Sequence, residues 1–490
     1  MPFQQSWVIA LLSSIGKGRS CNEWVQTMTE HYDAIVIGAG QAGPPLAARL
    51  GQQGLKTAIV ERHLMGGTCV NTGCIPTKTL VASARVAYLS RRAAEFGLKI
   101  DEPVSVDMAR VKARKDEIVA ASNAGVTAWV EDMDNVTLIR GHARFEGPRT
   151  ISVNGETLSA ERIFINVGAR ARTPDFPGLT EINCLTNSGM MEIDTLPEHL
   201  LIVGGSYIGL EFAQMYRRFG AQVTVVEMQE RLIAREDEDV SEAVREILEG
   251  EGVTVRLKAQ CMAFERSPGG VRMDIECELD STPIDGSHVL LAVGRTPNTD
   301  DLGLENAGIE VDERGFIRVD EALRTNIDGI WAIGEVNGRG AFTHTSYNDY
   351  EVVAANLFDN DPRRTSDRIL CYGLFIDPPL GRIGMTEQEA RASGRNVLVG
   401  KRMMTQVGRA REAGETRGFM KILVDADSKQ ILGAALLGLA GDEAVHALLD
   451  IMYAQQPYTV VSRAVHIHPT VSELIPTVLQ SLRPLEQDCE

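Results

Sequence analysis

The chain has 490 residues, of which 44% are hydrophobic and only 5% aromatic, as is ordinary for a large α/β protein with room for about three domains. Its formal net charge of −18 argues against nucleic acid or an anionic membrane surface as a partner, because both require basic patches. No apolar run approaches the ~20 residues that are needed to cross a membrane.

Residues 1–29 precede the core of the first predicted strand and are interpreted as an N-terminal extension. The apolar patch Trp7–Leu12 has no positive region before it and no convincing small-residue cleavage site after it, so it makes a poor signal peptide. We expect Met1–Thr27 to be loosely ordered.

A strand, a glycine turn and a helix open the first predicted domain. The apolar run Tyr32–Ile37 ends in the turn Gly38–Gly43, and a helical stretch follows. The glycines of such a turn let the backbone approach a pyrophosphate at the helix N-terminus. A second strand, Lys56–Val60, ends in Glu61, where an acidic side chain can bind a pair of ribose hydroxyls. The pattern predicts a dinucleotide site that includes Gly38, Gly40, Gly43 and Glu61.

The most informative stretch follows directly, between Gly66 and Lys78. Its cysteines, Cys69 and Cys74, are the one close pair among eight cysteines. On a regular helix their side chains would point about 140° apart, but the neighbouring glycines and Pro76 allow an irregular helix start where the sulfurs can close a small ring. A strained, accessible disulfide at a helix start is typical of a redox centre, because the helix dipole favours a thiolate. The alternative is a pair of small core residues.

The other cysteines are scattered through the chain and include no CxxC pair. This is the usage of a reducing compartment rather than of a secreted disulfide framework. We therefore expect a cytoplasmic protein, and no residue pattern predicts a metal site.

Scaffold elements are predicted next. Helical patterns cover Leu80–Phe96 and Val106–Met133. Short strands are expected over Val136–Ile139, Thr150–Val153 and Arg162–Val167, and the last of them ends at Gly168.

The strand, glycine turn and helix then recur. The apolar strand His199–Val203 leads into the turn Gly204–Gly209, a helix runs on through Phe219, and the next strand, Gln222–Val226, ends in Glu227. A repeated nucleotide module implies that one chain binds two nucleotides. The residues of this second site are Gly204, Ser206, Tyr207, Gly209 and Glu227.

The last part of the chain reads as one more α/β unit. Leu374–Pro379 opens it, and strands are predicted over Phe419–Asp425 and Ile431–Leu437, with helices that begin at Asp442 and Pro457. Near its end stands the run His466-Ile467-His468-Pro469-Thr470-Val471-Ser472-Glu473.

These motifs resemble the class I flavin disulfide reductases, the family of dihydrolipoamide dehydrogenase, glutathione reductase and the mercuric reductases. The resemblance runs from about Met28 to about Pro484 and is strongest to bacterial FAD-containing oxidoreductases that are similar to mercuric reductase. It implies an α/β fold with two Rossmann-like dinucleotide-binding domains, for FAD and NAD, and a C-terminal α/β dimerisation domain. The implied division is FAD domain 30–180, NAD(P) domain 181–293, return to the FAD domain 294–350 and dimerisation domain 351–490.

The resemblance also implies the cofactors. The first nucleotide is FAD and the second is a nicotinamide nucleotide. Glu227 would accept a hydrogen bond from a ribose 2′-hydroxyl and repel a 2′-phosphate, which favours NADH, while the nearby Arg231 and Arg235 keep NADPH possible. Further cofactor contacts are implied for Gly67, Thr68, Lys78, Gly168, Gly294, Arg295, Gly334 and Glu335.

The catalytic roles are likewise implied by the resemblance. Cys74 is expected to rest against the flavin as a thiolate, and Cys69 to exchange with substrate. His468 would move the proton, with Glu473 orienting its ring, although Thr470-x-x-Glu473 also reads as a helix capping box.

Glu211 lies in the apolar stretch Ile208–Ala213, where a charged side chain is more often paired than on a solvated helix face. The resemblance pairs it with Lys78 beside the flavin. Tyr207 matches an aromatic residue that covers the flavin in some members, and a core position is the equal alternative.

Two positions depart from the family pattern. Ser206 stands where glycine is usual, and Glu335 stands where the family has aspartate on the ribityl chain of FAD. The extra methylene of Glu335 is expected to weaken FAD retention.

The substrate is open between two classes. The dyad of His468 and Glu473 favours a disulfide or dithiol, because thiol exchange needs a base. The overall similarity favours a metal ion such as Hg(II), although the C-terminus holds only Cys489 in place of a cysteine pair. A third alternative is a flavin-binding protein without turnover. The family places the histidine opposite the disulfide of the other subunit, which predicts a homodimer with a shared active site.

Overall fold

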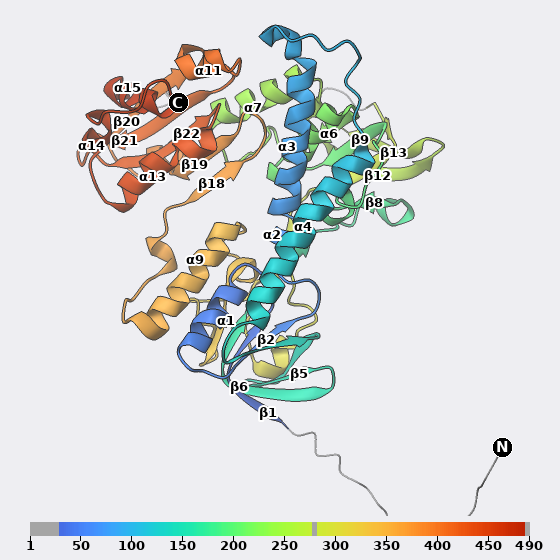
Figure 1. Cartoon of the computed structure of the whole chain (residues 1–490), viewed down its shortest axis with the longest axis vertical. Coiled ribbons are helices and arrows are strands. Elements are labelled where there is room, and N and C mark those ends of the chain that lie inside the picture. Colours follow the sequence, from blue (N-terminus) through green and yellow to red (C-terminus); the bar gives the residue numbers. More distant parts are fainter. Residues whose placement is uncertain (1–28, 277–281, 486–490) are drawn as a thin grey trace, which may run out of the picture.

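The computed structural model describes residues 29–276 and 282–485, so the predicted extension Met1–Thr27 lies outside the described residues. Figure 1 shows three lobes, and two long helices, α3 (Cys74–Arg91) and α4 (Met108–Glu131), run between the first lobe and the second. The mixed α/β fold that the sequence predicts is confirmed, whereas the individual domain boundaries stay predictions.

The first lobe is built on a sheet whose central strands are parallel. A strand from late in the chain, β17, pairs with β6, so this lobe joins two segments that are remote in sequence. The helices α1 (Gly43–Gln52) and α9 (Thr343–Ala354) belong to the same lobe. In spatial order its strands are β3 (Val136–Arg140), β2 (Thr57–Glu61), β1 (Glu30–Ile37), β6 (Glu156–Ile165), β5 (Thr150–Val153) and β4 (Ala143–Gly147), with β17 (Ile330–Ala332) on β6.

The second lobe repeats the parallel arrangement on a smaller scale. Its central strand is followed by helix α6 (Tyr207–Phe219), and α7 (Glu238–Gly250) connects two further strands. A three-stranded antiparallel sheet of β12 (Gln260–Ser267), β13 (Gly270–Glu276) and β14 (Ile284–Gly286) accompanies it. The parallel strands are, in order, β11 (Thr254–Arg256), β10 (Gln222–Val226), β9 (His199–Val203), β15 (His288–Leu291) and β8 (Cys184–Leu185).

The strands β7 (Ala169–Ala171) and β16 (Arg295–Pro297) pair as a two-stranded antiparallel ribbon. The chain leaves the first lobe through β7 and returns to it through β16. The third lobe is an antiparallel sheet with helices α11 (Gly408–Glu412), α13 (His446–Tyr453), α14 (Thr459–Ser462) and α15 (Ile475–Gln480). Its strands are, in order, β18 (Cys371–Leu374), β19 (Leu380–Gly384), β22 (Ile431–Leu437), β21 (Phe419–Asp425), β20 (Val397–Met403) and β23 (Arg483–Pro484).

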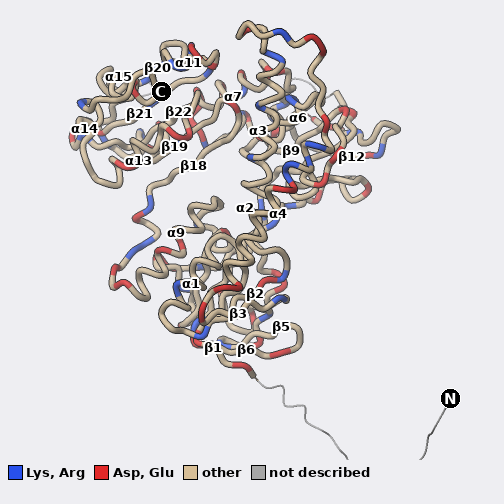
Figure 2. Tube along the Cα trace, viewed as in Figure 1, with Lys and Arg blue, Asp and Glu red and all other residues tan. Residues whose placement is uncertain are grey.

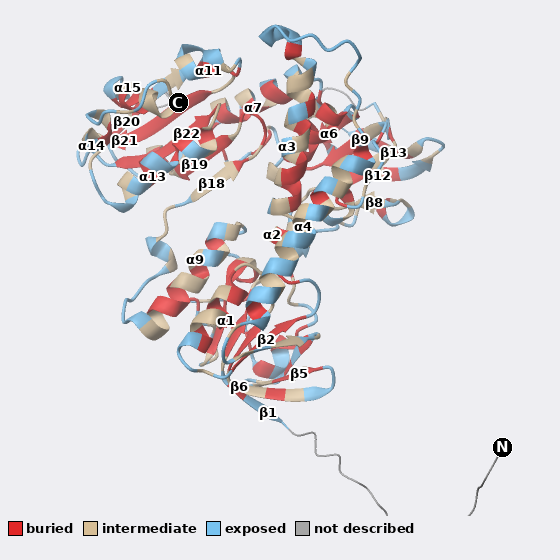
Figure 3. Ribbon diagram, in the orientation of Figure 1, coloured by how far each residue is buried: buried red, intermediate tan, exposed pale blue. Residues whose placement is uncertain are grey.

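Burial explains why the central strands read as continuous apolar runs. Every residue of β2, β21 and β22 is buried, and Figure 3 shows the buried residues concentrated in the sheets. Strands covered on both faces carry no polar alternation, which is why the sequence marks them so clearly.

The helix predicted over Leu80–Phe96 differs from the observed one at both ends. α3 begins at Cys74, because Pro76 lies in the first turn, where its missing N–H costs no hydrogen bond. The helix ends at Arg91, and Ala93–Phe96 forms a 3₁₀ turn that closes at Gly97 with a left-handed φ of 78°. The helix therefore presents Cys74, rather than a scaffold residue, at its N-terminus.

Candidate functional site

The cysteine segment spans one short helix and the start of the next. Cys69 lies in helix α2 (Gly67–Asn71), and Cys74 begins α3 after Gly73. A Cβ added to Gly73 would lie 2.8 Å from the carbonyl oxygen of Thr68, so only glycine allows this tight passage between the helices. Both cysteines are free thiols in this structure, which corresponds to the reduced form of the predicted pair.

The pKa values of the two thiols are shifted in opposite directions. A hydrogen bond with Cys69 lowers the pKa of Cys74 to about 6, and Thr343 and the charge of Lys78 act in the same direction. The Sγ atom of Cys74 lies 3.3 Å from Oγ1 of Thr343. The same hydrogen bond, together with burial, raises the pKa of Cys69. Thr343 and the ammonium group of Lys78 thus favour the thiolate form of Cys74 over that of Cys69.

Lys78 and Glu211 are brought together from α3 and α6. Lys78 Nζ donates to Glu211 Oε2 at 2.6 Å, and the other carboxylate oxygen accepts from the backbone N–H of Phe375 at 3.0 Å. The Glu211 side chain is only 7% exposed, so it does not stand on a solvated helix face. A buried carboxylate with both oxygens engaged holds the ammonium group of Lys78 in place beside the thiol pair.

The first glycine turn packs closely against the end of a neighbouring strand. A Cβ on Gly38 would lie 2.4 Å from the carbonyl oxygen of Asn166, and one on Gly43 would lie 2.3 Å from that of Gly38. Glu61 accepts from the N–H of Ala39 at 2.8 Å through Oε2. The turn thus opens helix α1 with bare backbone, as a pyrophosphate site requires.

The second turn repeats this backbone geometry. A Cβ on Gly204 would lie 2.5 Å from the carbonyl oxygen of Ala292, and Glu227 accepts from the N–H of Gly205 at 2.6 Å. Gly209 approaches the carbonyl oxygen of Gly204, where a Cβ would lie only 2.1 Å away. Ser206 is exposed at the start of α6. The residues present fit one dinucleotide at each turn.

The remaining predicted cofactor residues lie along the strand ends of the first lobe. Glu335 accepts from Arg295 Nε at 2.6 Å. Gly168 and Gly294 both have positive φ, 63° and 107°, and a Cβ added to either would meet nothing within 4 Å. Gly67 packs on the first turn, Gly334 follows β17, and Thr68 is exposed in α2.

Sequence reasoning missed two buried polar residues beside the first turn. Asn166 donates through Nδ2 to the carbonyl oxygen of Gly38 at 3.1 Å. Asp349 in α9 accepts from the N–H of Gly334 at 2.8 Å, and burial raises its pKa although Arg368 opposes the shift. The stretch around Asp349 is polar, with Asn348 before it and Glu351 shortly after it, so no local signal of the kind that identified Glu211 marked this residue.

Tyr207 begins α6 and belongs to an aromatic cluster. Its ring meets those of Phe342 and Tyr372 edge-on, with centroids 6.1 and 5.4 Å away. Burial raises the pKa of Tyr207 to about 12, so the side chain stays neutral. Tyr372 in turn donates to Glu236 at 2.5 Å. The ring is half-buried, which suits either a movable cover or a core position.

His468 and Glu473 form a close pair at the surface of the third lobe. His468 Nδ1 lies 2.8 Å from Glu473 Oε2, and the histidine side chain is 80% exposed. The N–H of Glu473 also donates to Thr470 Oγ1 at 3.2 Å, so the orienting contact and the capping contact coexist. The loop that carries the pair lies between α14 and α15, which Figure 1 places on the side of the third lobe away from α2. Within one chain, the histidine and the cysteines are not brought together.

A group of three carboxylates in the described residues, Asp237, Asp239 and Glu387, has the spacing of metal ligands. Lys421 Nζ lies among them at 2.8, 2.6 and 2.7 Å, so a fixed ammonium group already occupies the space between the three carboxylates. Within residues 29–276 and 282–485, no helix is both long and apolar enough to cross a membrane.

Comparisons with known proteins agree with this geometry. The family model described as pyridine nucleotide-disulphide oxidoreductase matches residues 32–349, and the model of its dimerisation domain matches residues 371–479. The probable pyridine nucleotide-disulfide oxidoreductase RclA of Escherichia coli K12 is 36% identical over 450 residues, which cover 90% of this chain and 97% of that protein. A dihydrolipoyl dehydrogenase of Thermus scotoductus is 34% identical over 445 residues, covering 90% of this chain and 95% of the relative.

Among solved structures, the Cu(II) complex of the HOCl-induced flavoprotein disulfide reductase RclA from Escherichia coli superposes with a TM-score of 0.84. It is 35% identical, and the match covers 91% of this chain and 99% of that one.

Proposed function

The chain belongs to the pyridine nucleotide-disulphide oxidoreductase family, and from this premise we propose that it passes electrons from NADH, through FAD, to a disulfide substrate. As a flavin disulfide reductase it is an enzyme, so the alternative of a flavin-binding protein without turnover is set aside. The matching dimerisation domain makes it a homodimer.

The observation that carries the proposal is the asymmetry of the thiol pair. Cys74 holds the negative charge next to Lys78, while Cys69 keeps its proton. Such a pair has one thiol suited to face a flavin and one suited to exchange with substrate once a base removes its proton. An exposed histidine with a fixed carboxylate, His468 with Glu473, is the kind of base this step needs.

The glycine turns divide the cofactors. We assign FAD to the first turn with Glu61, because the thiol segment packs directly on that turn, and the nicotinamide nucleotide to the second turn with Glu227 and Tyr207. Bound FAD would accept a hydride and deliver two electrons to the Cys69–Cys74 disulfide. Further contacts to FAD are assigned to Gly67, Thr68, Gly168, Gly294, Arg295, Gly334 and Glu335.

NADH is the preferred donor in this proposal. Glu227 is held by the N–H groups of Gly205 and Gln229, at 2.6 and 2.8 Å, so its charge stays where a 2′-phosphate would have to lie. Arg231 donates to the carbonyl oxygen of Ala234. A fixed carboxylate that has no arginine partner within residues 29–276 and 282–485 disfavours NADPH.

The exchange step balances as follows. Two electrons and one proton, which together make up the hydride from NADH, open the Cys69–Cys74 disulfide to the Cys69 thiol and the Cys74 thiolate. Cys69, deprotonated by His468 of the other subunit, attacks the substrate disulfide and releases one substrate thiol, which takes that proton. Cys74 then attacks Cys69, which restores the disulfide and releases the second thiol after one more proton is taken up.

The test is NADH oxidation by the purified flavoprotein with lipoamide as acceptor. We expect turnover in the wild type and a loss of roughly 100- to 10,000-fold in His468→Ala, the range of general acid–base catalysis. His466→Ala is the matched control and should retain activity, because His466 contacts only the carbonyl oxygen of Ala464 among its hydrogen-bond partners in the described residues. Equal rates for His468→Ala and the wild type would contradict the proposal.

A metal ion is the second candidate substrate, because the similar RclA structure is a Cu(II) complex. Reduction of Cu(II) breaks no disulfide in the substrate and needs no proton on a leaving thiol. Turnover with Cu(II) that survives in His468→Ala, together with no turnover of lipoamide by the wild type, would favour the metal ion.

The shared site is tested with mixed dimers. Cys69→Ala and His468→Ala homodimers should both be inactive toward lipoamide. In a mixed dimer both defects fall in one site, and the other site is intact, so activity returns. If His468 acted within its own chain, each site of the mixed dimer would carry a defect, and a FAD-containing mixed dimer would stay inactive.

The sulfur assignment has a spectroscopic test. NADH-reduced protein should show a long-wavelength charge-transfer band from the Cys74 thiolate, which Cys74→Ser abolishes and Cys69→Ser keeps. Because the pKa of Cys74 is lowered to about 6, the thiolate is present above that pH, and the band should fade as the pH falls through it. A band that titrates near the ordinary pKa of a thiol, or that vanishes in both variants alike, contradicts the assignment.

A further inference from the structure

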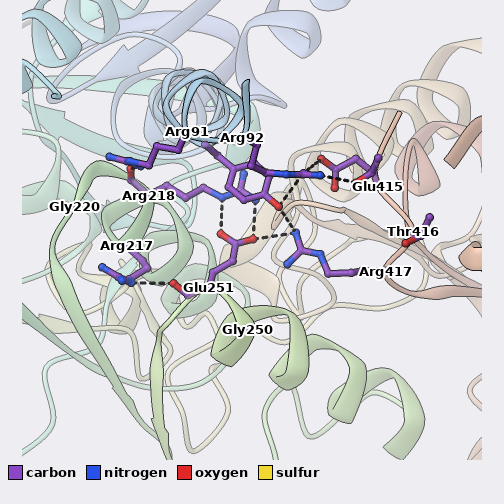
Figure 4. Close-up of a pocket in the computed structure, with 12 residues that line it drawn as sticks. Arg91, Arg92, Arg217, Arg218, Gly220, Gly250, Glu251, Glu415, Thr416 and Arg417 are labelled. Carbon is purple, nitrogen blue, oxygen red and sulfur yellow. Dashed lines mark hydrogen bonds and ion pairs between the residues drawn. The ribbon is translucent and has the colours of Figure 1, made fainter. Parts of the chain in front are cut away.

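A cavity of about 550 Å³ lies at the end of α3 that is remote from Cys74. Figure 4 shows side chains from the ends of α3, α6 and α7 and from the segment 414–417 of the third lobe around it. The C-terminal end of α3, the second lobe and the third lobe therefore meet at this cavity. Its lining is Tyr88, Arg91, Arg92, Arg217, Arg218, Gly220, Gly250, Glu251, Gly414, Glu415, Thr416 and Arg417.

The lining is strongly basic in a chain whose net charge is −18. Acidic and basic residues are interspersed along the trace in all three lobes (Figure 2), whereas here five arginines face two glutamates. Three of the arginines have carboxylate partners: Arg218 and Arg417 pair with Glu251 at 2.7 and 3.0 Å, and Arg92 pairs with Glu415 at 2.8 Å.

The other two arginines have no carboxylate partner among the described residues. Arg91 donates to the carbonyl oxygen of Arg218, and Arg217 donates to those of Glu251 and Ala221 at 2.9 and 3.2 Å. Burial lowers the pKa of Arg91, and the positive charge of Arg217 lowers it further. Two guanidinium groups that repel each other without a counterion are a source of binding energy for an anion.

A structural role explains only part of this arrangement. Arginines in the last turn of α3 and α6 offset the negative end of each helix dipole, and they bind carbonyl groups at neighbouring helix ends: Arg91 binds that of Arg218 in α6, and Arg217 binds that of Glu251 after α7. That role requires neither a cavity of this size nor two neighbouring arginines without a carboxylate partner among the described residues. The volume lies within the ~300–1,000 Å³ of sites for small molecules.

We propose that this cavity binds a small anion that carries two or more carboxylate or phosphate groups, held by Arg91 and Arg217. The planar guanidinium fork pairs with either group through two parallel hydrogen bonds. An occupant would contact the C-terminal ends of α3 and α6. The opposite ends of the same two helices carry Cys74, Lys78 and Glu211, so the two sites share a rigid frame.

Gly250 offers a sharp test, because it lines the cavity and a Cβ added there would meet nothing within 4 Å. Gly250→Glu places a carboxylate inside the cavity and leaves every arginine intact. Gly250→Gln has nearly the same shape without the charge and is the matched control. The measurement is calorimetric titration of the FAD-containing dimer with citrate and, in a separate arm, with pyrophosphate.

We expect saturable binding of at least one probe to the wild type and to Gly250→Gln, and binding at least about tenfold weaker in Gly250→Glu. The probe that binds more tightly identifies carboxylate or phosphate as the preferred group. Absence of saturable binding of both probes to the wild type, or equal binding by the two Gly250 variants, would overturn the proposal.

A second pair of variants tests the arginines directly. Arg91→Gln with Arg217→Gln should weaken binding by at least about tenfold. The control, Arg110→Gln with Arg364→Gln, removes the same charge from two side chains that are each 68% exposed and lie outside the lining, and it should bind as the wild type does. Equal weakening of anion binding in both double variants would mean that only the net charge of the protein matters, and it would overturn the assigned site.

Discussion

The two glycine turns, Gly38–Gly43 and Gly204–Gly209, have the same backbone geometry but different neighbouring segments. In each, the first glycine has a positive φ, 101° and 112°, and lies against the carbonyl oxygen at the end of a neighbouring strand. In each, a glutamate from the next strand accepts from the amide that follows the first glycine. The first turn, however, is covered by other segments of the chain, whereas the middle of the second is open.

The third residue of each turn, Gly40 in the first and Ser206 in the second, shows how the neighbouring segments restrict the side chain. A Cβ on Gly67 of the thiol segment would lie 2.9 Å from the Cα of Gly40, and one on Gly40 would lie 3.3 Å from Nδ2 of Asn166. Ser206 stands at the matching place in the second turn and is exposed. The middle position of the first turn is thus kept small by Asn166, and the thiol segment can approach it only through another glycine, Gly67.

The largest effect is expected where the turns agree. Gly38→Ala and Gly204→Ala each force a side chain into a positive φ and against a backbone carbonyl oxygen, which costs roughly 2–6 kcal/mol as strain and overpacking combined. Gly38→Ala should be purified without FAD. Gly204→Ala should retain FAD and lose binding of NADH. Flavin absorbance after gel filtration and NADH titration measure the two outcomes.

The control for this pair is Gly54→Ala, at a positive φ of 76° where a Cβ would meet nothing within 4 Å. It carries backbone strain alone and should keep both nucleotides. If Gly204→Ala lost FAD as readily as Gly38→Ala, the division of the two cofactors between the two turns would be wrong.

The next largest effect is expected at Gly40, the third residue of the first turn. Gly40→Ser brings a side chain against Asn166, in the turn on which Gly67 of the thiol segment packs, at a cost of about 1–3 kcal/mol. It should weaken FAD binding by about tenfold or more and slow lipoamide reduction, because the thiol segment is displaced with the turn. Dialysis against apoprotein and the lipoamide assay measure both. Unchanged FAD affinity would show that the segment yields without cost.

A smaller effect is expected at Asn166, whose place in the second module is taken by Ala292. Asn166→Ala removes the donor to the carbonyl oxygen of Gly38 and leaves that buried acceptor short of a partner, which costs about 1–2 kcal/mol. FAD should dissociate several-fold faster. Asn298→Ala is the control, because Asn298 donates to the neighbouring carbonyl oxygen of Val167 and not to the turn. Equal dissociation rates in the two variants would contradict a special role of Asn166.

The sequence predicted the parts of this comparison that depend on local pattern. The strands β9, β10, β21 and β22 coincide with their predicted ranges, because continuous apolar runs between turn residues are strong signals. A helix start at the cysteine segment was expected from its glycines and Pro76, but the helical pattern was assigned only from Leu80, because the periodicity fades in the irregular first turn of α3. Family and enzyme class followed from motifs at fixed spacing and are confirmed by the comparisons.

The tertiary contacts could not be read from pattern. Nothing near Asn166 in the sequence indicates that its amide reaches Gly38, more than a hundred residues earlier. The pairing of Lys78 with Glu211 was expected only through the family resemblance, and the cavity at the far end of α3 left no motif, because its arginines come from three separate segments. The roles of the site residues and the domain boundaries stay predictions.

The smallest effect is expected from Ser206→Gly, which restores the usual residue of the second turn. The Ser206 side chain makes no capping hydrogen bond to α6, so its loss removes no contact of the described structure. Replacement of an N-cap serine by glycine costs only a few tenths of a kcal/mol even where the cap is formed. NADH affinity should therefore change by less than about threefold, in contrast to the loss of FAD in Gly40→Ser. A large gain in NADH affinity would mean that the serine side chain obstructs the pyrophosphate. The exposed position of Ser206 would then not be tolerated without cost to nucleotide binding.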